Sequence, residues 1–342
     1  MAVHGYALDG DGPGGGRVRH RSPRIARTAR GVRNVARGPW RELGVGELPE
    51  STICRFTPGP AAPNSGTNPS QPRRSVMRRV HQPYADVFLR NRVDLAVPGV
   101  EEEIAERLRD TGLVTVDGLA SRTAVLAFAT RIMNLVPHRD SDSDGLTTIR
   151  DTRRHAHRAG FAGFGNGPLA PHTERSGTPH PPRLMLLVCG QAAETGGECL
   201  LTDGQAVHAD LFTGERDAGV ALAQPRTAFF GAGDGHATQV FTVHDDLRVS
   251  VRLRFDGLAR WNPIVQPYVP RLRAAAGRHQ VRLDLAPGQG YLLDNERWLH
   301  ARRAFTGDRL FWRALGQPLF PMLRGFVPAS TSARTPMLSE AG

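Results

Sequence analysis

The sequence predicts a mainly β domain with flanking helices, arranged as a double-stranded β-helix, or jelly roll. The second half of the chain contains many short apolar or alternating runs of the length typical of strands. Helical patterns precede these runs, and one insert interrupts them. The predicted strands are residues 184–188, 226–230, 239–243, 249–255, 281–285, 290–293 and 310–315.

Two helices and a strand are expected ahead of this series. An acidic first turn predicts a short helix over residues 100–109, and residues 113–116 then form a strand. Ser121 is a favoured N-cap for a longer helix over residues 124–136, which carries an apolar stripe. Within the strand series, we expect a further helix after Pro270.

The strands differ in their expected burial. Residues 184–188 form a continuous apolar run, which is typical of a fully buried strand. Residues 249–255 alternate four apolar side chains with one serine and two arginines, so the apolar set should face the core. Residues 138–168 are polar and rich in glycine, and we interpret residues 161–168 as an active-site loop.

The chain is expected to contain a tail, a folded domain and a short C-terminal extension. Residues 1–80 are rich in Arg, Gly and Pro without a sustained apolar period, which predicts a disordered tail. This segment is a passive tail, a basic arm that touches anions, or a product of start-codon choice with Met77 as the true first residue. The folded domain is expected over residues 97–325, with a flexible tail at 326–342.

The net charge of +11 is concentrated in the first 80 residues, which hold 14 Arg and 5 acidic residues. The chain has no lysine, a bias that GC-rich codon use explains more simply than function. We therefore do not expect nucleic acid as a partner of the folded domain. No run reaches the roughly 18 apolar residues of a membrane helix. Three scattered cysteines are typical of a reducing compartment, so we expect a cytoplasmic protein without membrane contact.

A histidine–carboxylate pair and a distant histidine form the most informative pattern. His172 and Glu174 are two residues apart, so in an extended segment both side chains point to one side. His300 is expected from a distant strand of the same barrel. Two imidazoles and one carboxylate suit a mononuclear iron(II) ion and leave three metal positions open. Spacing alone does not exclude zinc.

Three segments around these residues resemble the TauD/TfdA (taurine dioxygenase-like) family of iron(II)/2-oxoglutarate oxygenases. They are Leu169–Glu174 (LAPHTE), Gly196–Leu200 (GGECL) and Asp294–Arg313, and they occur in the family's order. The resemblance covers roughly residues 100–325 and implies a clavaminate synthase-like oxygenase domain. Glu in place of the more usual Asp makes the chain more similar to the clavaminate synthase-like and amino-acid-hydroxylating members.

The resemblance implies Fe(II) at His172, Glu174 and His300, with 2-oxoglutarate as cosubstrate and O2 as oxidant. Arg309 matches the family's Arg that pairs with the far carboxylate of 2-oxoglutarate. Arg313 matches a second Arg, which often holds a substrate anion or supports the cosubstrate.

Cys199 is a departure from the family pattern, which usually has Thr or Ser at this position to bond 2-oxoglutarate. A thiol is a weaker hydrogen-bond donor than a hydroxyl. Either the hydrogen bond to 2-oxoglutarate is weakened, or Thr202 donates it instead, or Arg309 contributes most of the binding of 2-oxoglutarate.

The implied reaction is hydroxylation of an unactivated C–H bond with release of succinate and CO2. Retention of Glu174 argues against a halogenase. Mixed basic and acidic side chains around the metal suit a zwitterion, so we expect a small amino-acid-like substrate. The oligomeric state stays open. The candidate substrate residues are the loop 161–169 with Arg175, Ser176, Arg252, Asp256 and Arg313.

Three other functions stay open. The first is a desaturase or cyclising oxygenase that acts on a natural-product intermediate. The second is a metal-binding jelly roll without catalysis. The third is an Arg-rich nucleic-acid-binding protein, which rests on residues 1–80 alone and would show steeply salt-dependent binding.

Overall fold

The structure is a computed structural model that describes residues 83–154 and 160–329. These residues belong to one compact unit that starts at residue 76. The predictions for residues 1–80, including the role of Met77, lie outside the described residues, as do residues 330–342. None of the helices in the described part is both long and apolar enough to cross a membrane.

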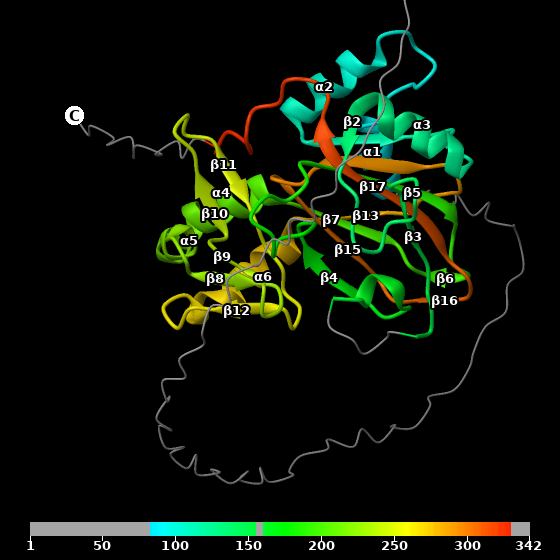
Figure 1. The fold of residues 1–342 in the computed structure, drawn as a ribbon. Helices are drawn as coiled ribbons and strands as arrows, with labels where there is room; N and C mark the ends of the chain where they lie inside the picture. Colours follow the sequence, from blue (N-terminus) through cyan, green and yellow to red (C-terminus); the bar gives the residue numbers. More distant parts are fainter. Residues whose placement is uncertain (1–82, 155–159, 330–342) are drawn as a thin grey trace, which may run out of the picture. The chain divides into compact units, whose positions relative to one another are not determined.

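Two antiparallel sheets form the centre of this domain (Figure 1). The larger sheet has the strand order β1-β14-β5-β17-β2, with β3 also paired to β17. The second sheet has the order β13-β7-β15-β4. The larger sheet comprises β1 (Leu113–Val116), β2 (Met133–Leu135), β3 (Thr147–Ile149), β5 (Leu184–Gln191), β14 (Gly290–Asp294) and β17 (Leu310–Pro318). The second comprises β4 (Leu169–His172), β7 (Cys199–Asp203), β13 (Gln280–Leu283) and β15 (Trp298–Arg302).

The larger sheet is buried on both faces. Its inner face and the second sheet share one apolar cluster, which includes Met185 and Leu187. Its outer face packs against α2 (Val100–Asp110) and α3 (Arg122–Ile132) in another cluster, which includes Leu186. Successive side chains of a strand point to opposite faces, so burial of both faces explains the continuous apolar run of β5. The mainly β fold with flanking helices is confirmed.

An insert between β7 and β13 builds a third apolar cluster. Figure 1 shows this green-to-yellow part beside the two sheets. One insert was expected, although its first two helices were not. Its elements are α4 (Gly204–Gly214), α5 (Arg216–Ala223), β8 (Ala228–Phe230), β9 (His236–Thr238), β10 (Phe241–Val243), β11 (Val249–Val251), β12 (Ala259–Trp261), η2 (Gln266–Tyr268) and α6 (Val269–Arg278).

The second predicted helix is shorter than expected. Ser121 caps it as predicted, because its hydroxyl accepts a hydrogen bond from Ala124 N at 3.1 Å. The helix ends at Ile132, however, and Met133–Leu135 become strand β2. These residues pair with Gly316–Pro318 of β17, so tertiary strand pairing outweighs the local helical pattern.

The segment 249–255 is a strand only over its first three residues. Its apolar side chains are nevertheless buried as the alternation predicted, at Val249, Val251, Leu253 and Phe255. Burial therefore follows the period of two beyond the end of the hydrogen-bonded strand.

Both ends of the folded domain extend beyond the expected limits. Helix α1 (Pro83–Arg90) precedes residue 97, and Val93 N donates to Thr115 O at 3.1 Å. Phe326, which was assigned to a flexible tail, is 1% exposed and exchanges two 2.8 Å backbone hydrogen bonds with Val249. The boundary at residue 326 is therefore corrected, because this aromatic side chain completes the core of the insert.

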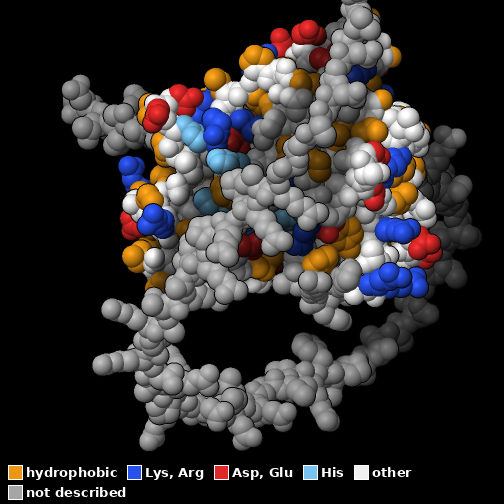
Figure 2. Space-filling view, in the orientation of Figure 1, with side chains coloured by type: hydrophobic (Ala, Val, Ile, Leu, Met, Phe, Trp, Pro, Cys, Tyr) orange, Lys and Arg blue, Asp and Glu red, His pale blue; other side chains and the backbone are white. Residues whose placement is uncertain are grey.

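Charged side chains of both signs are mixed on the face of the folded domain shown in Figure 2. This agrees with the small charge surplus of the chain after residue 80.

Candidate active site

The two histidines and the glutamate of the sequence pattern lie together on the second sheet. His172 ends β4, and His300 lies opposite it in β15 as its register partner. The two imidazole centroids are 4.2 Å apart, and His172 Nε2 is 4.0 Å from Glu174 Oε1. One donor atom from each of the three residues lies within 4.8 Å of the others. A single strand pairing therefore brings the distant histidine to the histidine–carboxylate pair.

The orientation of the donor atoms fits a divalent metal ion. Ala170 O lies 2.9 Å from His172 Nδ1, which places the proton on Nδ1 and leaves Nε2 as a ligand. His300 Nε2 is buried without a hydrogen-bond partner among the described residues. Burial lowers the pKa of both imidazoles, so both are in the neutral form that binds metals.

Glu174 is held from two sides. Its carboxylate accepts a hydrogen bond from Arg313 Nη1. Its backbone N donates to Asn295 Oδ1 at 2.6 Å, and Asn295 Nδ2 donates to Glu174 O at 3.0 Å. Burial acts to raise the pKa of Glu174, but the opposing effects, of which the charge of Arg313 is the largest, lower it to about 2. Glu174 is therefore ionised and fixed in place, as a metal ligand must be.

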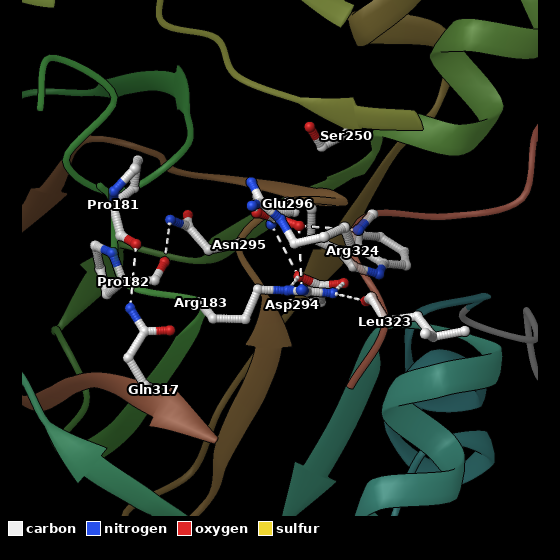
Figure 3. A network of polar contacts seen from close by, with 12 residues as sticks. Pro181, Pro182, Arg183, Ser250, Asp294, Asn295, Glu296, Gln317, Leu323 and Arg324 are labelled. Carbon is white, nitrogen blue, oxygen red and sulfur yellow. Dashed lines mark hydrogen bonds and ion pairs between the residues drawn. The ribbon is translucent and has the colours of Figure 1, made fainter. Parts of the chain in front are cut away.

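Asn295 belongs to a buried polar network behind these residues, shown in Figure 3. The neighbouring Asp294 accepts two hydrogen bonds from Arg183, at 2.6 and 3.0 Å. Arg183 Nη1 also lies 3.1 Å from Glu296 Oε2. These contacts fix the turn after β14, from which Asn295 reaches the backbone of Glu174. Asn295 therefore orients this region through backbone groups.

A cavity of about 490 Å³ lies in front of the three predicted metal residues. Residues from both sheets line it, together with part of the insert. The segment 161–168, expected to be an active-site loop, contributes Ala162, Gly163 and Phe164 to the wall, and Gly160 and Leu169 line the cavity on either side of it. This part of the predicted loop therefore lies at the cavity.

Arg302, two residues after His300 on β15, fastens this loop. Its guanidinium donates to the carbonyls of Ala162, Gly163, Gly165 and Gly167 at distances between 2.6 and 3.4 Å. Burial lowers the pKa of Arg302 to about 10. The strand that carries the second histidine therefore also sets the position of the loop.

Arg309, Cys199 and Tyr291 also line the cavity. Arg309 Nη2 donates to Cys199 Sγ at 3.8 Å, and its guanidinium lies 3.6 Å from the centroid of the Phe311 ring. No carboxylate in the described part of the chain forms an ion pair with it. Gly197 has φ +75°, and a Cβ there would come within 3.1 Å of the Arg309 side chain. The Gly-Gly turn before β7 thus leaves room for this arginine.

Thr202 does not lie at the cavity. It is three residues after Cys199 on β7, so its side chain points to the opposite face of the sheet. Its hydroxyl donates to Ala276 O at 3.4 Å, on the side of the insert. The prediction that Thr202 could replace the missing family hydroxyl is therefore wrong.

Two of the predicted substrate residues also lie elsewhere. Ser176 is buried but does not line the cavity. Arg252 donates to Thr178 O and Pro179 O at 3.1 and 3.3 Å and lines a separate cavity of about 240 Å³. Their assignment to substrate binding is corrected, because Ser176 does not reach the cavity and the guanidinium of Arg252 binds backbone carbonyls beside the separate cavity.

Arg175, Asp256 and Arg313 do line the cavity in front of the metal residues. Asp256 accepts two hydrogen bonds from Arg254, at 2.7 and 2.5 Å, so its charge is matched. Arg175 has φ 50°, a left-handed conformation that is uncommon outside glycine. Their roles toward a substrate stay predictions.

Sequence reasoning missed several cavity residues. Arg302 had a usable signal, since its spacing of two from His300 puts both on one face of a strand. Tyr291 lay inside a recognised strand, but its direction depended on which face of that strand turned inward. His138 also lines the cavity, and no periodic pattern in its polar segment pointed to it.

Comparisons with known proteins agree with this geometry. A family model described as "Taurine catabolism dioxygenase TauD, TfdA family" matches residues 78–315. Among curated proteins, uridine-5'-phosphate dioxygenase from Amycolatopsis sp is 29% identical over 136 residues, which are 36% of this chain and 50% of that protein. The chain therefore spans about half the length of this curated relative.

Three similar solved structures carry the same fold at low sequence identity. Asparagine oxygenase, in complex with Fe(II), hydroxyasparagine and succinate, has a TM-score of 0.51 and 16% identity, with 64% of this chain and 78% of that chain covered. OrfP, with Fe, succinate and (3S)-hydroxy-L-Arg, has a TM-score of 0.53 and 13% identity, with 65% and 81% covered. AAD-2, with Mn(II) and N-oxalylglycine, has a TM-score of 0.52 and 16% identity, with 68% and 96% covered. Since the family match covers most of the chain and includes all three predicted metal residues, the chain belongs to the TauD/TfdA family.

Proposed function

We propose that the protein is an Fe(II)- and 2-oxoglutarate-dependent dioxygenase that hydroxylates an unactivated C–H bond of a small amino-acid-like substrate. The observation that carries this proposal is the cluster of His172, Glu174 and His300 at a cavity that is also lined by Arg309, which forms no ion pair with any described carboxylate. A metal site beside an uncompensated buried cation suits a cosubstrate that chelates the metal and carries a second carboxylate.

The side chains divide the work of such a reaction. His172, Glu174 and His300 would hold Fe(II), and Arg309 would pair with the far carboxylate of 2-oxoglutarate. When bound, Fe(II) supplies the redox chemistry that couples O2 and 2-oxoglutarate decarboxylation to oxidation of the substrate. Arg302 keeps the glycine-rich loop over the cavity, which limits access of water to the reacting groups.

Charges along the cavity support a zwitterionic substrate. Arg175 and Asp234 both line it, and neither forms an ion pair with another described residue. An amino acid carries the complementary carboxylate and ammonium groups. The solved relatives named above include structures with hydroxyasparagine and with hydroxyarginine. Arg313, which contacts Glu174, would act on the substrate from the metal side of the cavity.

A phosphorylated nucleoside is a second candidate substrate. The curated relative is named for uridine-5'-phosphate, and the cavity wall contains more arginines than carboxylates. An unpaired Arg175 would bind a phosphate as readily as a carboxylate. This candidate differs from an amino acid by needing no carboxylate partner for an ammonium group.

A substrate panel scored by succinate formation tests both candidates. Protein loaded anaerobically with Fe(II) would receive 2-oxoglutarate and O2 with each L-amino acid or with uridine-5'-phosphate. Mass spectrometry of the product separates hydroxylation, which adds one oxygen, from desaturation or cyclisation, which removes two hydrogens. Absence of succinate above the level of metal-free protein with every compound, together with no 2-oxoglutarate binding, would contradict the proposal.

A further inference from the structure

Tyr291 is a buried polar residue that has no role in the proposed function as described above. It lies on β14 in the larger sheet, and its side chain is 0% exposed. Its hydroxyl oxygen is buried without a nitrogen or oxygen hydrogen-bond partner among the described residues. Leaving a buried hydroxyl unpaired costs free energy, so a group of this kind needs an explanation.

The surroundings of Tyr291 supply one. Tyr291, Cys199 and Arg309 line the same cavity, and the Cys199 side chain lies next to both of the others. Cys199 faces this space from the opposite sheet, but its thiol is only a weak donor. Arg309 has its charge buried there at 5% exposure, with no ion pair to any described carboxylate. One cation and one hydroxyl therefore share a space in which the described protein provides no anion.

Tyr291 is also in the right protonation state to donate. Burial raises its pKa well above the ordinary value, so the phenol keeps its proton at neutral pH. Burial similarly raises the pKa of Cys199, so the neighbouring thiol stays neutral and adds no negative charge. An incoming carboxylate would thus meet a donor and a cation, and no repelling group from Cys199.

We propose that Tyr291 and Arg309 together bind the distal carboxylate of a 2-oxo dicarboxylate, with Tyr291 Oη donating a hydrogen bond to one of its oxygens. This inference rests on the proposed function and identifies a binding residue within it. The hydroxyl that Cys199 does not offer from β7 is supplied by the facing strand β14. The chain thereby selects a cosubstrate with two carboxylates over one that has only the oxo acid end.

Calorimetric titration of the full chain loaded with Mn(II), which supports no turnover, tests the proposal. The ligands are 2-oxoglutarate and 2-oxobutanoate, a 2-oxo acid that lacks the distal carboxylate. Tyr291→Phe should weaken binding of 2-oxoglutarate roughly tenfold, because a hydrogen bond to a charged group is lost. Binding of 2-oxobutanoate should not change. Tyr268→Phe, at a half-buried tyrosine near Arg271, is the matched control and should change neither affinity.

Two further variants separate ligand binding from a structural role. In ligand-free protein, Tyr291→Phe should keep or raise the Tm, since it deletes a buried hydroxyl that has no nitrogen or oxygen partner among the described residues and only a weak thiol beside it. A hydroxyl that supports the core would lower the Tm instead. Adding Cys199→Thr to Tyr291→Phe should recover part of the lost 2-oxoglutarate affinity, because a hydroxyl then enters the same space from β7.

The outcomes distinguish this inference from the proposed function. Unchanged 2-oxoglutarate affinity in Tyr291→Phe, or an equal loss for both acids, overturns the role of Tyr291 while the proposed function stands. Failure of the unaltered Mn(II)-loaded protein to bind either acid overturns the proposed function and the inference with it. A selective loss for 2-oxoglutarate at an unchanged or higher Tm supports both.

Discussion

Arg183 and Arg309 are buried to the same degree, at 6% and 5% exposure, yet their surroundings are opposite. Arg183 makes a bidentate pair with Asp294 and a further contact with Glu296, so every charge in that network has a partner (Figure 3). Arg309 donates to the Cys199 thiol and lies beside the Phe305 and Phe311 rings, and no described carboxylate pairs with it. The satisfied cluster holds backbone in place, whereas the unsatisfied one lies at a cavity and suits a ligand from outside.

Paired and unpaired buried groups also lie side by side at the predicted metal site. His300 Nε2 is another buried atom without a partner at the same cavity, and Glu174 beside it is held by Arg313 and Asn295. His300 Nε2 faces the cavity without a partner among the described residues, whereas the Asn295 network behind Glu174 is matched. A buried atom without a partner is therefore a candidate ligand-binding atom where it also faces the cavity.

The largest expected effect comes from the metal ligands. His172→Ala, Glu174→Ala and His300→Ala should each abolish turnover and the binding of one Fe(II) per chain, measured by anaerobic titration. His279→Ala removes a histidine that pairs with Asp210 on the insert and should leave both unchanged. Full activity in any of the three ligand variants would refute the assignment of the site.

The two arginines should differ strongly in their effect on stability. Arg183→Met leaves Asp294 buried without its partner and should lower the free energy of unfolding by about 3–5 kcal/mol. Arg309→Met removes a buried charge that no described carboxylate matches, so stability should be unchanged or higher. Denaturant unfolding of both variants without ligand measures the difference. Similar losses for the two would show that Arg309 also has a structural partner.

His208 is a buried residue with an unpaired atom that does not line the active-site cavity, so we expect it to affect stability and not ligand binding. It packs against Phe212, Phe241 and Phe326, and its Nδ1 has no partner in the described part of the chain. Burial lowers the pKa of His208 to about 4. The unfolded chain then binds more protons between pH 6.5 and 4, so stability is present above this range and is lost as the pH falls through it.

The loss should reach about 2–3 kcal/mol at the acid end, from the difference between the folded and unfolded pKa. Urea unfolding across this pH range measures it. His208→Phe should flatten the profile without changing 2-oxoglutarate binding, since the residue does not line the cavity. A change in that affinity would link His208 to the site after all.

The smallest effect concerns 2-oxoglutarate itself. Arg309→Ala should raise the KM for 2-oxoglutarate about tenfold or more, because the distal carboxylate loses its buried partner. Arg309→Lys should recover this only in part, since a point charge cannot reproduce the guanidinium fork. Arg303→Ala, at an exposed arginine in the turn after β15, is the control. A similar rise in the control would mean that overall charge matters and not this contact.

Local sequence patterns were enough to predict helices and strands and to identify the three candidate metal ligands. Ser121 fixed the start of a helix, and the spacing of His172 and Glu174 placed two donors on one side. They were not enough for boundaries set by pairing, as at Met133–Leu135, because distant strand residues decided that conformation. The prediction for Thr202 was wrong for a related reason, since the neighbours against which a strand packs decide which of its side chains point toward the cavity.

The sequence by itself determined the fold class, the three candidate metal ligands and Arg309 as a candidate cosubstrate residue, since these follow from period, spacing and family motifs. Only the tertiary structure decided which buried groups have partners. Tyr291 and Arg302 became visible when strands from two sheets and a loop met at one cavity. Hydrogen-bond satisfaction is a property of the assembled fold, because each donor's partner comes from a segment far away in the chain.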